Sequence, residues 1–252
     1  MVEYKVNSPE DSQEFVTTHA YNKLYGRLKA LKNRKGRIIH VIGAPGTGKS
    51  ANIYEAVNEL KLNVYEPILI LDNVDESSWK IYHDLFKTLR IGLNVKSNEK
   101  IFKKASEYDA VLWADKFHDS HLLHENKVGF SQWMNNKGLK SFLFYFLLIL
   151  YYFRHIFKLR KINLVFQTAW TIHVGGIKYD LFTDFGLISK LLILILKVFF
   201  EVVEISYTES EIVEIVKKHK PEANESEIRF YIKRYGNKIR LILQSLREDY
   251  RK

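Results

Sequence analysis

The chain has 252 residues, of which 46% are hydrophobic and 27% are charged. This composition excludes a disordered or fibrous chain and predicts a globular protein that buries roughly 70% of its unfolded surface. Cysteine is absent, which excludes disulfides and thiolate metal sites and is typical of a reducing compartment, so we expect a cytoplasmic protein. The formal net charge of +10 favours a polyanionic partner such as nucleic acid, although a lysine-rich solvated surface gives the same charge.

The first segment, residues 9–35, is expected to form an N-terminal helix. Ser8 is a suitable cap, Pro9 suits the first turn, and apolar residues recur at helical spacing up to Leu31. The residues at the start lack a basic region followed by an apolar region, so we do not expect a secretory signal.

Five short apolar or β-branched runs then predict the strands of a sheet, at 37–42, 67–71, 110–114, 162–166 and 201–206. Helices are expected between them, at 50–60, 142–153 and 185–200. Strands that alternate with helices are typical of a mostly parallel sheet covered on both faces, so the predicted fold class is α/β. From residue 207 the sequence is polar with helical periodicity, which predicts two or three small helices. We therefore expect an α/β domain over 1–206 and a helical lid over 207–252.

Two apolar stretches raise the question of a membrane. Residues 142–153 are unbroken but number only 12, and the stretch 187–203 is interrupted by Lys190, Lys197 and Glu201. A membrane-spanning helix needs about 20 apolar residues, whereas shorter runs are more often buried core helices. We therefore expect two buried helices and no membrane partner, while contact of 142–153 with a membrane surface stays open.

One octet matches the Walker A pattern G-x-x-x-x-G-K-[ST] of phosphate-binding loops. It consists of Gly43, Ala44, Pro45, Gly46, Thr47, Gly48, Lys49 and Ser50, and we call it the P-loop. The glycines let successive backbone N–H groups converge on phosphate oxygens, and the following helix directs its positive end at them. Lys49 is expected to reach the β- and γ-phosphates, and the Ser50 hydroxyl to bind magnesium. The octet therefore predicts binding of ATP with Mg²⁺.

Such a site also needs a carboxylate that supports the Mg²⁺ ion from the end of a neighbouring strand. Asp115 follows the run 110–114, and Asp72 follows the run 67–71. The strand before Asp72 directly follows the helix predicted at 50–60 and is therefore expected to be an outer strand. Asp115 lies farther along the sequence, so another strand and helix fit between the P-loop helix and the strand that precedes Asp115. We favour Asp115 and keep Asp72 as the alternative.

At this point the chain resembles the AAA+ superfamily, in particular its compact archaeal-type ATPases. The resemblance is carried by the P-loop, AVLWAD at 110–115, LVFQTAW at 164–170 and RYGNKIRLILQSL at 234–246. It implies that Thr168, or Gln167 beside it, senses the γ-phosphate, and that Arg240 of the lid meets the nucleotide. It also implies an ATP hydrolase in which Lys49, Asp115, Thr168 and Arg240 take part in the reaction.

Two departures from the family pattern point to slow or partner-stimulated hydrolysis. Lys116 follows Asp115, where the family has a glutamate that polarises water, and the possible substitutes Asp119 and Glu125 are not at motif spacing. No arginine occurs between Arg160 and Arg229, which excludes an arginine supplied to a neighbouring subunit from that segment.

The favoured function is an ATP-driven conformational switch that acts on an unknown protein partner. A nucleoside- or nucleotide-type small-molecule kinase and a non-hydrolysing nucleotide-binding scaffold remain alternatives. The kinase is disfavoured because the central segments hold few arginines for a second phosphorylated ligand. His118, His121 and His124 favour a polar loop rather than a metal site, because no complementary ligand cluster accompanies them.

Overall fold

A five-stranded parallel sheet forms the centre of the computed structural model, which describes residues 15–113, 128–169, 171–174 and 177–249. Every pair of neighbouring strands in this sheet is parallel. The strand order is β2 (Val64–Tyr65), β4 (Ala110–Trp113), β6 (Leu164–Thr168), β1 (Ile38–Ile42) and β9 (Glu201–Glu204). The α/β fold class and the five-stranded parallel sheet predicted from the sequence are confirmed.

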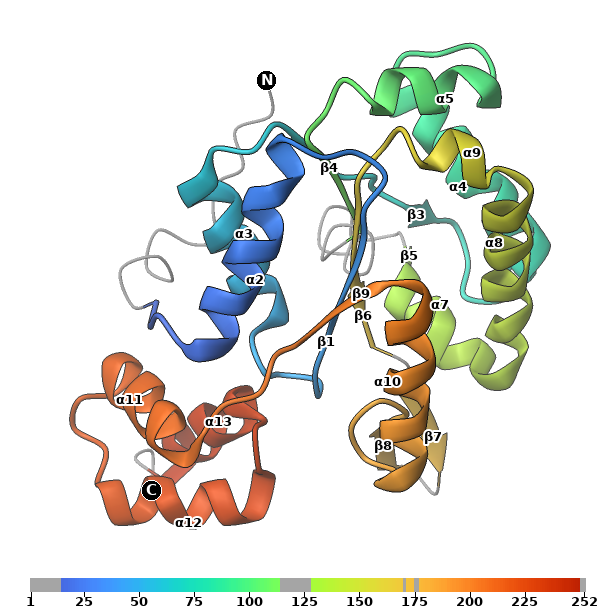
Figure 1. The fold of residues 1–252 in the computed structure, drawn as a ribbon. Helices are drawn as coiled ribbons and strands as arrows, with labels where there is room; N and C mark the ends of the chain where they lie inside the picture. Colours follow the sequence, from blue (N-terminus) through green and yellow to red (C-terminus); the bar gives the residue numbers. More distant parts are fainter. Residues whose placement is uncertain (1–14, 114–127, 170, 175–176, 250–252) are drawn as a thin grey trace.

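Helices cover both faces of the sheet, as Figure 1 shows. One face packs on α2 (His19–Lys29) and α3 (Lys49–Leu60), and Ile39 and Val41 of β1 are completely buried there. The opposite face carries α4 (Ser78–Gly92), α5 (Asn98–Ala105), α7 (Phe130–Lys137) and α8 (Phe142–Arg154). Burial on both faces explains why the strands are β-branched runs without polar alternation.

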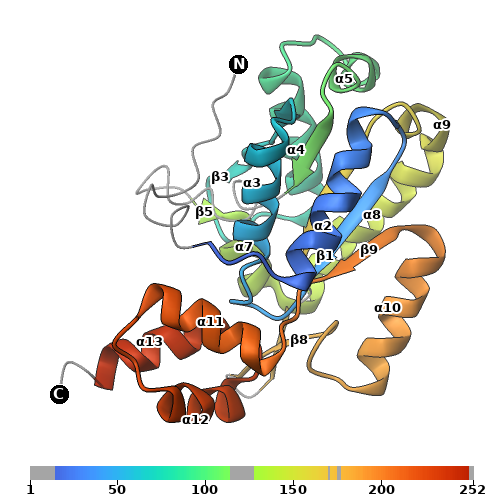
Figure 2. The ribbon, with the colours of Figure 1, turned by 60° about the vertical axis from the view of Figure 1, so that its left-hand side comes forward.

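Three short helices end the described chain, namely α11 (Glu209–His219), α12 (Glu225–Tyr235) and α13 (Ile239–Asp249). Thr208 begins α11 through a capping box with Glu211, and the side chain of Asn224 caps α12. Their inner side chains, such as Val216 and Ile242, join the same apolar cluster as α2 and α3. Figure 2 shows these helices beneath that side of the sheet.

The prediction of a sheet strand at 67–71 is wrong. The outer strand of the main sheet is β2, and β3 (Ile70–Leu71) instead pairs antiparallel with β5 (Val128–Gly129). Pro67 lacks the N–H that a continuous strand would donate, while Leu69 and Leu71 are buried in the core around α4. The apolar run therefore serves the core without belonging to the main sheet.

The remaining elements of the described chain are four short ones, with the two strands of a hairpin counted together, and one helix of 13 residues. They are η1 (Ala30–Lys32), η3 (Gly138–Ser141), α9 (Ile156–Leu159), the hairpin of β7 (Thr171–Val174) and β8 (Ile177–Asp180), and α10 (Leu187–Phe199). The N-terminal helix is shorter than expected, because the Thr18 hydroxyl accepts a hydrogen bond from the Tyr21 N–H at 3.1 Å and begins α2 at His19. The expected start at residue 9 lies outside the described residues.

The start of β6 is held by a buried amide. Nδ2 of Asn163 contacts the carbonyl oxygens of Leu31 at 3.1 Å, Arg34 at 2.8 Å and Asp109 at 2.8 Å. Its Oδ1 accepts a hydrogen bond from the Arg37 N–H at 3.1 Å. One side chain thus satisfies backbone groups of two segments, 31–37 and the chain just before β4, that meet at the amino-terminal edge of the sheet.

The expectation that 142–153 and 185–200 form helices is confirmed by α8 and α10, but the expectation that both are buried is wrong. Phe144 is the buried residue of α8, and Ser189 is the buried residue of α10. Within the described part of the chain, no helix has the length and apolarity required to cross a membrane.

Candidate nucleotide-binding site

The P-loop connects the end of β1 to the start of α3. Gly46 and Gly48 have φ angles of 84° and 83°, in the left-handed region that favours glycine. At Gly43, an added Cβ would lie 2.7 Å from the carbonyl oxygen of Ile205. The Thr47 hydroxyl donates to the Ala44 carbonyl at 2.9 Å and closes the turn. Backbone conformation at Gly46 and Gly48 and lack of space at Gly43 therefore explain why these positions of the motif are glycines.

Lys49 folds back over the loop that precedes it. Its ammonium group is buried and donates to the carbonyl oxygens of Gly43 at 2.8 Å and Ala44 at 3.1 Å. A buried cation needs such acceptors, and an anion at the loop would compete with these carbonyls for it. The arrangement thus brings a cation to the concave backbone of a phosphate-binding loop.

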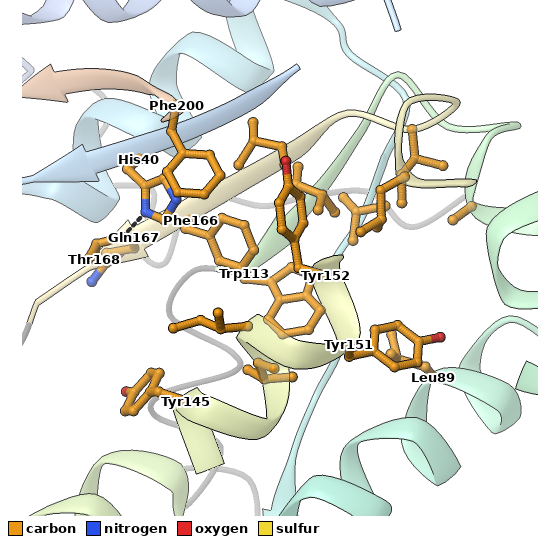
Figure 3. Close-up of a pocket in the computed structure, with 18 of the residues that line it drawn as sticks. His40, Leu89, Trp113, Tyr145, Tyr151, Tyr152, Phe166, Gln167, Thr168 and Phe200 are labelled. Carbon is orange, nitrogen blue, oxygen red and sulfur yellow. Dashed lines mark hydrogen bonds between the residues drawn. The ribbon is translucent and has the colours of Figure 1, made fainter. Parts of the chain in front are cut away.

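Ser50, at the start of α3, contacts the end of β6. Its hydroxyl donates to Oε1 of Gln167 at 2.9 Å. The Thr168 hydroxyl instead lies 2.9 Å from Nδ1 of His40 on the other face of the sheet (Figure 3). Successive side chains of a strand point to opposite faces, so only one of the two can face α3. The structure brings Gln167, the second choice from the sequence, to Ser50.

The environment of Thr168 is apolar. His40 stacks on Phe166 with ring centroids 5.0 Å apart and lies 4.9 Å from the Phe200 ring. Burial lowers the pKa of His40 to about 4, so the imidazole is neutral at pH 7. Thr168 therefore bonds to a neutral ring and not to the P-loop.

Strand β4 lies beside β6, which lies beside β1, so the carboxyl end of β4 meets the edge of the sheet that carries the P-loop. Asp115 is two positions beyond the last residue of β4 but lies outside the described residues, as do His118, His121 and His124. Asp72 is exposed and follows β3, away from the main sheet. Among the described residues, no three His, Asp or Glu side chains gather as a metal site.

The donors near the P-loop suit a magnesium ion. The hydroxyl of Ser50 is a hard oxygen ligand, the class that Mg²⁺ prefers, and the amide oxygen of Gln167 holds it in place at 2.9 Å. Mg²⁺ keeps several waters and uses few protein ligands, so one such oxygen and one carboxylate are enough.

The first turn of α13 lies against the P-loop. The backbone N–H of Arg240 donates to the carbonyl oxygen of Gly46 at 3.1 Å. An added Cβ on Gly46 would lie 3.1 Å from Cβ of Arg240. Lys238 forms an ion pair with Asp184, at 3.8 Å, in the turn before α10. The C-terminal helices therefore touch the backbone that surrounds the candidate phosphate position.

A second connection runs through Tyr207, which the sequence did not indicate. Its hydroxyl accepts a hydrogen bond from Nδ2 of Asn52 at 2.8 Å, and Nδ2 also contacts the Gly48 carbonyl at 2.8 Å. The Tyr207 N–H donates to Oδ1 of Asn237 at 2.6 Å. Burial raises the pKa of Tyr207 to about 12, so the hydroxyl stays protonated. No local pattern marks these residues, since Asn52 and Tyr207 are far apart in the sequence.

The two neighbours at the end of β6 can be distinguished by substitution. We expect Gln167→Ala to weaken binding of Mg²⁺ and ATP by about 3- to 10-fold, the value of one hydrogen bond, because Ser50 loses its partner. Thr168→Val is expected to leave affinity within about twofold, because its hydroxyl faces His40. Isothermal titration calorimetry measures both, and a larger loss for Thr168→Val would contradict this assignment.

The known proteins that were compared with this chain share little sequence with it. No protein-family model matches the chain, and no curated protein matches it. Among solved structures, the replication initiator DnaA bound to AMPPCP and single-stranded DNA is similar, with 16% identity and a TM-score of 0.46. AMPPCP-bound DnaA from Aquifex aeolicus is similar with 17% identity and a TM-score of 0.42. Each comparison covers 96% of this chain but 65% of the other chain.

The fold expected from the family resemblance is present in the chain itself. The P-loop follows the central strand β1, the sheet is parallel with helices on both faces, and three C-terminal helices pack beside the loop. The chain has an α/β P-loop fold with C-terminal helices, which is the fold that the resemblance to the AAA+ superfamily implies. Fold alone does not specify the reaction, which depends on the residues of the site.

Proposed function

We propose that the chain binds ATP with Mg²⁺ at the P-loop and uses this binding to position its C-terminal helices, residues 207–252. The observation that carries the proposal is the hydrogen bond from the Arg240 N–H to the Gly46 carbonyl. Because α13 is attached to the backbone that would surround the phosphates, any adjustment of the P-loop to its ligand moves the start of α13. The protein then acts as a nucleotide-driven conformational switch.

Each residue of the site has a role in this proposal. Lys49 leaves the Gly43 and Ala44 carbonyls to contact the β- and γ-phosphates, and Ser50 binds Mg²⁺. Asp115 supports the ion from the end of β4, and Gln167 orders Ser50. Magnesium, when bound, neutralises phosphate charge.

Arg240 is the residue of the C-terminal helices that can report on the nucleotide. Its side chain is exposed and begins beside Gly46, at the edge of the P-loop. A guanidinium there can pair with phosphate oxygens through charge-assisted hydrogen bonds. Hydrolysis is slow or stimulated by a protein partner in this proposal, because Lys116 stands where a water-polarising glutamate is expected.

Replacing Arg240 by alanine tests the switch. We expect a loss of about 10-fold in affinity for Mg²⁺ and ATP, the value of a hydrogen bond to a charged group. We also expect ATP to slow amide exchange in α13 of the natural chain but not of the variant, as measured by hydrogen–deuterium exchange.

The matched control is Arg229→Ala, since Arg229 is also exposed in these helices but pairs with Glu225 of the same helix at 2.7 Å and with Glu209 of α11, and not with the P-loop. Equal affinity and equal protection in the two variants would refute a role of Arg240. Retained ATP binding with no turnover would instead identify the non-hydrolysing scaffold.

A further inference from the structure

Helix α10 leaves most of its apolar side chains exposed. Four of them follow the spacing i, i+4, i+7 and i+11, which places them on one helix face. We call this set the α10 stripe, and it consists of Leu187, Leu191, Leu194 and Val198. Their exposed fractions lie between 58% and 83%. An entire helix face of large aliphatic side chains therefore meets the surroundings of the protein.

Helix α8 repeats the pattern. Three exposed apolar side chains of α8 follow the spacing i, i+4 and i+7, and a fourth lies in α9, beyond the break at His155. We call this set the α8 stripe, and it consists of Phe146, Leu150, Phe153 and Phe157. Their exposed fractions lie between 50% and 77%. Single exposed apolar residues are normal, but two complete stripes mark an interaction surface.

A pocket of about 380 Å³ connects the two helices. Figure 3 shows its aromatic wall, which includes Trp113 and Phe166 from the sheet and Tyr152 from α8. Helix α10 contributes Phe199, and both Phe199 and Phe153 are exposed as well as pocket-lining. Both helices therefore line the pocket, and Phe153 belongs to the α8 stripe as well as to the pocket. We call the two stripes together with this pocket the α8–α10 surface.

The segment that carries both helices has an excess of basic residues, although Lys197 pairs with Glu204 of β9 at 2.6 Å. Residues 138–200 contain two acidic side chains, Asp180 and Asp184, and eight basic ones. The basic residues are Lys140, Arg154, Lys158, Arg160, Lys161, Lys178, Lys190 and Lys197. Asp180 is buried and accepts a hydrogen bond from the Phe182 N–H at 2.8 Å, while Asp184 accepts one from the Asp180 N–H at 2.9 Å. Neither helix carries an acidic residue.

We propose that the α8–α10 surface docks onto an anionic phospholipid bilayer, with both helices lying in the plane of the interface. Exposed apolar helix faces flanked by lysine and arginine are the combination that such interfaces bind. Helix α8 has 13 residues and is about 20 Å long, which suits a helix that lies on a bilayer. The sequence expectation of no membrane partner came from the lengths of the stretches, whereas the exposure of the stripes decides this proposal.

The positive charge of the protein beside the stripes also favours an anionic bilayer over other binding partners. A symmetric dimer would place two positive surfaces against each other and would be opposed by like-charge repulsion. Nucleic acid would satisfy the cations but would leave the aliphatic stripes without apolar contacts. An anionic lipid surface satisfies both the stripes and the cations.

Vesicle flotation of the full chain tests the proposal. We expect the protein to float with phosphatidylcholine vesicles that contain phosphatidylglycerol, to bind much less to phosphatidylcholine alone, and to bind less when salt rises from about 0.1 to 0.5 M. Phe153→Glu and Leu191→Glu are each expected to weaken binding at least about 10-fold, because a charge replaces a side chain that enters the apolar interface.

The matched control is Phe230→Glu on α12, because Phe230 and Phe153 are both 59% exposed. Circular dichroism of all three variants should match the natural chain. Equal losses in the control, or equal binding to neutral and anionic vesicles, would overturn the proposal. So would a dimer seen by analytical ultracentrifugation without lipid and lost in Leu191→Glu, because the occupant would then be a second copy.

Discussion

Replacing Lys49 by alanine is expected to lower the affinity for Mg²⁺ and ATP at least about 100-fold, because the P-loop loses the one cation that its own backbone holds in place. Charge-assisted hydrogen bonds to phosphate are the strongest polar contacts that such a site offers. Isothermal titration calorimetry on the full chain measures the change. Any ATP turnover of the natural chain should disappear as well.

The same substitution removes a hydrogen-bond donor from the Gly43 and Ala44 carbonyls, so stability has to be measured beside affinity. Lys49→Met keeps most of the aliphatic stem and serves as the partner variant, since it lacks only the ammonium group. Both variants should lose ATP binding while their thermal unfolding stays cooperative. Affinity within a few-fold of the natural chain in a folded Lys49→Ala variant would remove the P-loop from the proposed function.

The second large effect concerns stability. Asn163→Ala is expected to lower the free energy of unfolding by about 2 to 3 kcal/mol, because it leaves one buried and three partly buried backbone groups without this partner, at up to about 1 kcal/mol each. The affected groups are the carbonyls of Leu31, Arg34 and Asp109 and the N–H of Arg37. Urea denaturation followed by circular dichroism measures the loss.

A surface asparagine provides the comparison. Asn98 accepts a hydrogen bond from Arg90 at 2.5 Å at an exposed position, so Asn98→Ala should cost no more than about 0.5 kcal/mol. If both asparagine variants unfold at the same urea concentration as the natural chain, the buried amide does not hold the sheet edge together.

Short-range sequence patterns were sufficient to predict the secondary structure of the P-loop and of the strand and helix that flank it. The octet specifies its own strand, turn and helix, because the glycines, the lysine and the β-branched run before them act over about a dozen residues. Thr208 and Glu211 likewise form the capping box that begins α11. The three C-terminal helices follow from short-range periodicity in the same way.

The structure differs from the sequence-based predictions where the position of a residue depends on partners that are distant in the sequence. The run 67–71 has the composition of a strand, but its leucines enter a core that α4 builds. The stretch 142–153 is apolar enough to be buried, yet periodicity does not say whether another element covers the helix. Gln167 and Thr168 are adjacent, and the direction of each side chain is set by the register of β6 against β1. Asp115, outside the described residues, stays a prediction.

The end of β6 stands between two chemically different surroundings. Gln167 touches the start of α3, and Thr168 touches His40 at the wall of the apolar pocket. A ligand that displaces this strand end from one side alters the free energy of occupancy on the other. By thermodynamic linkage, if the proposed nucleotide and the proposed lipid both shift this strand end, each changes the dissociation constant of the other by one common factor.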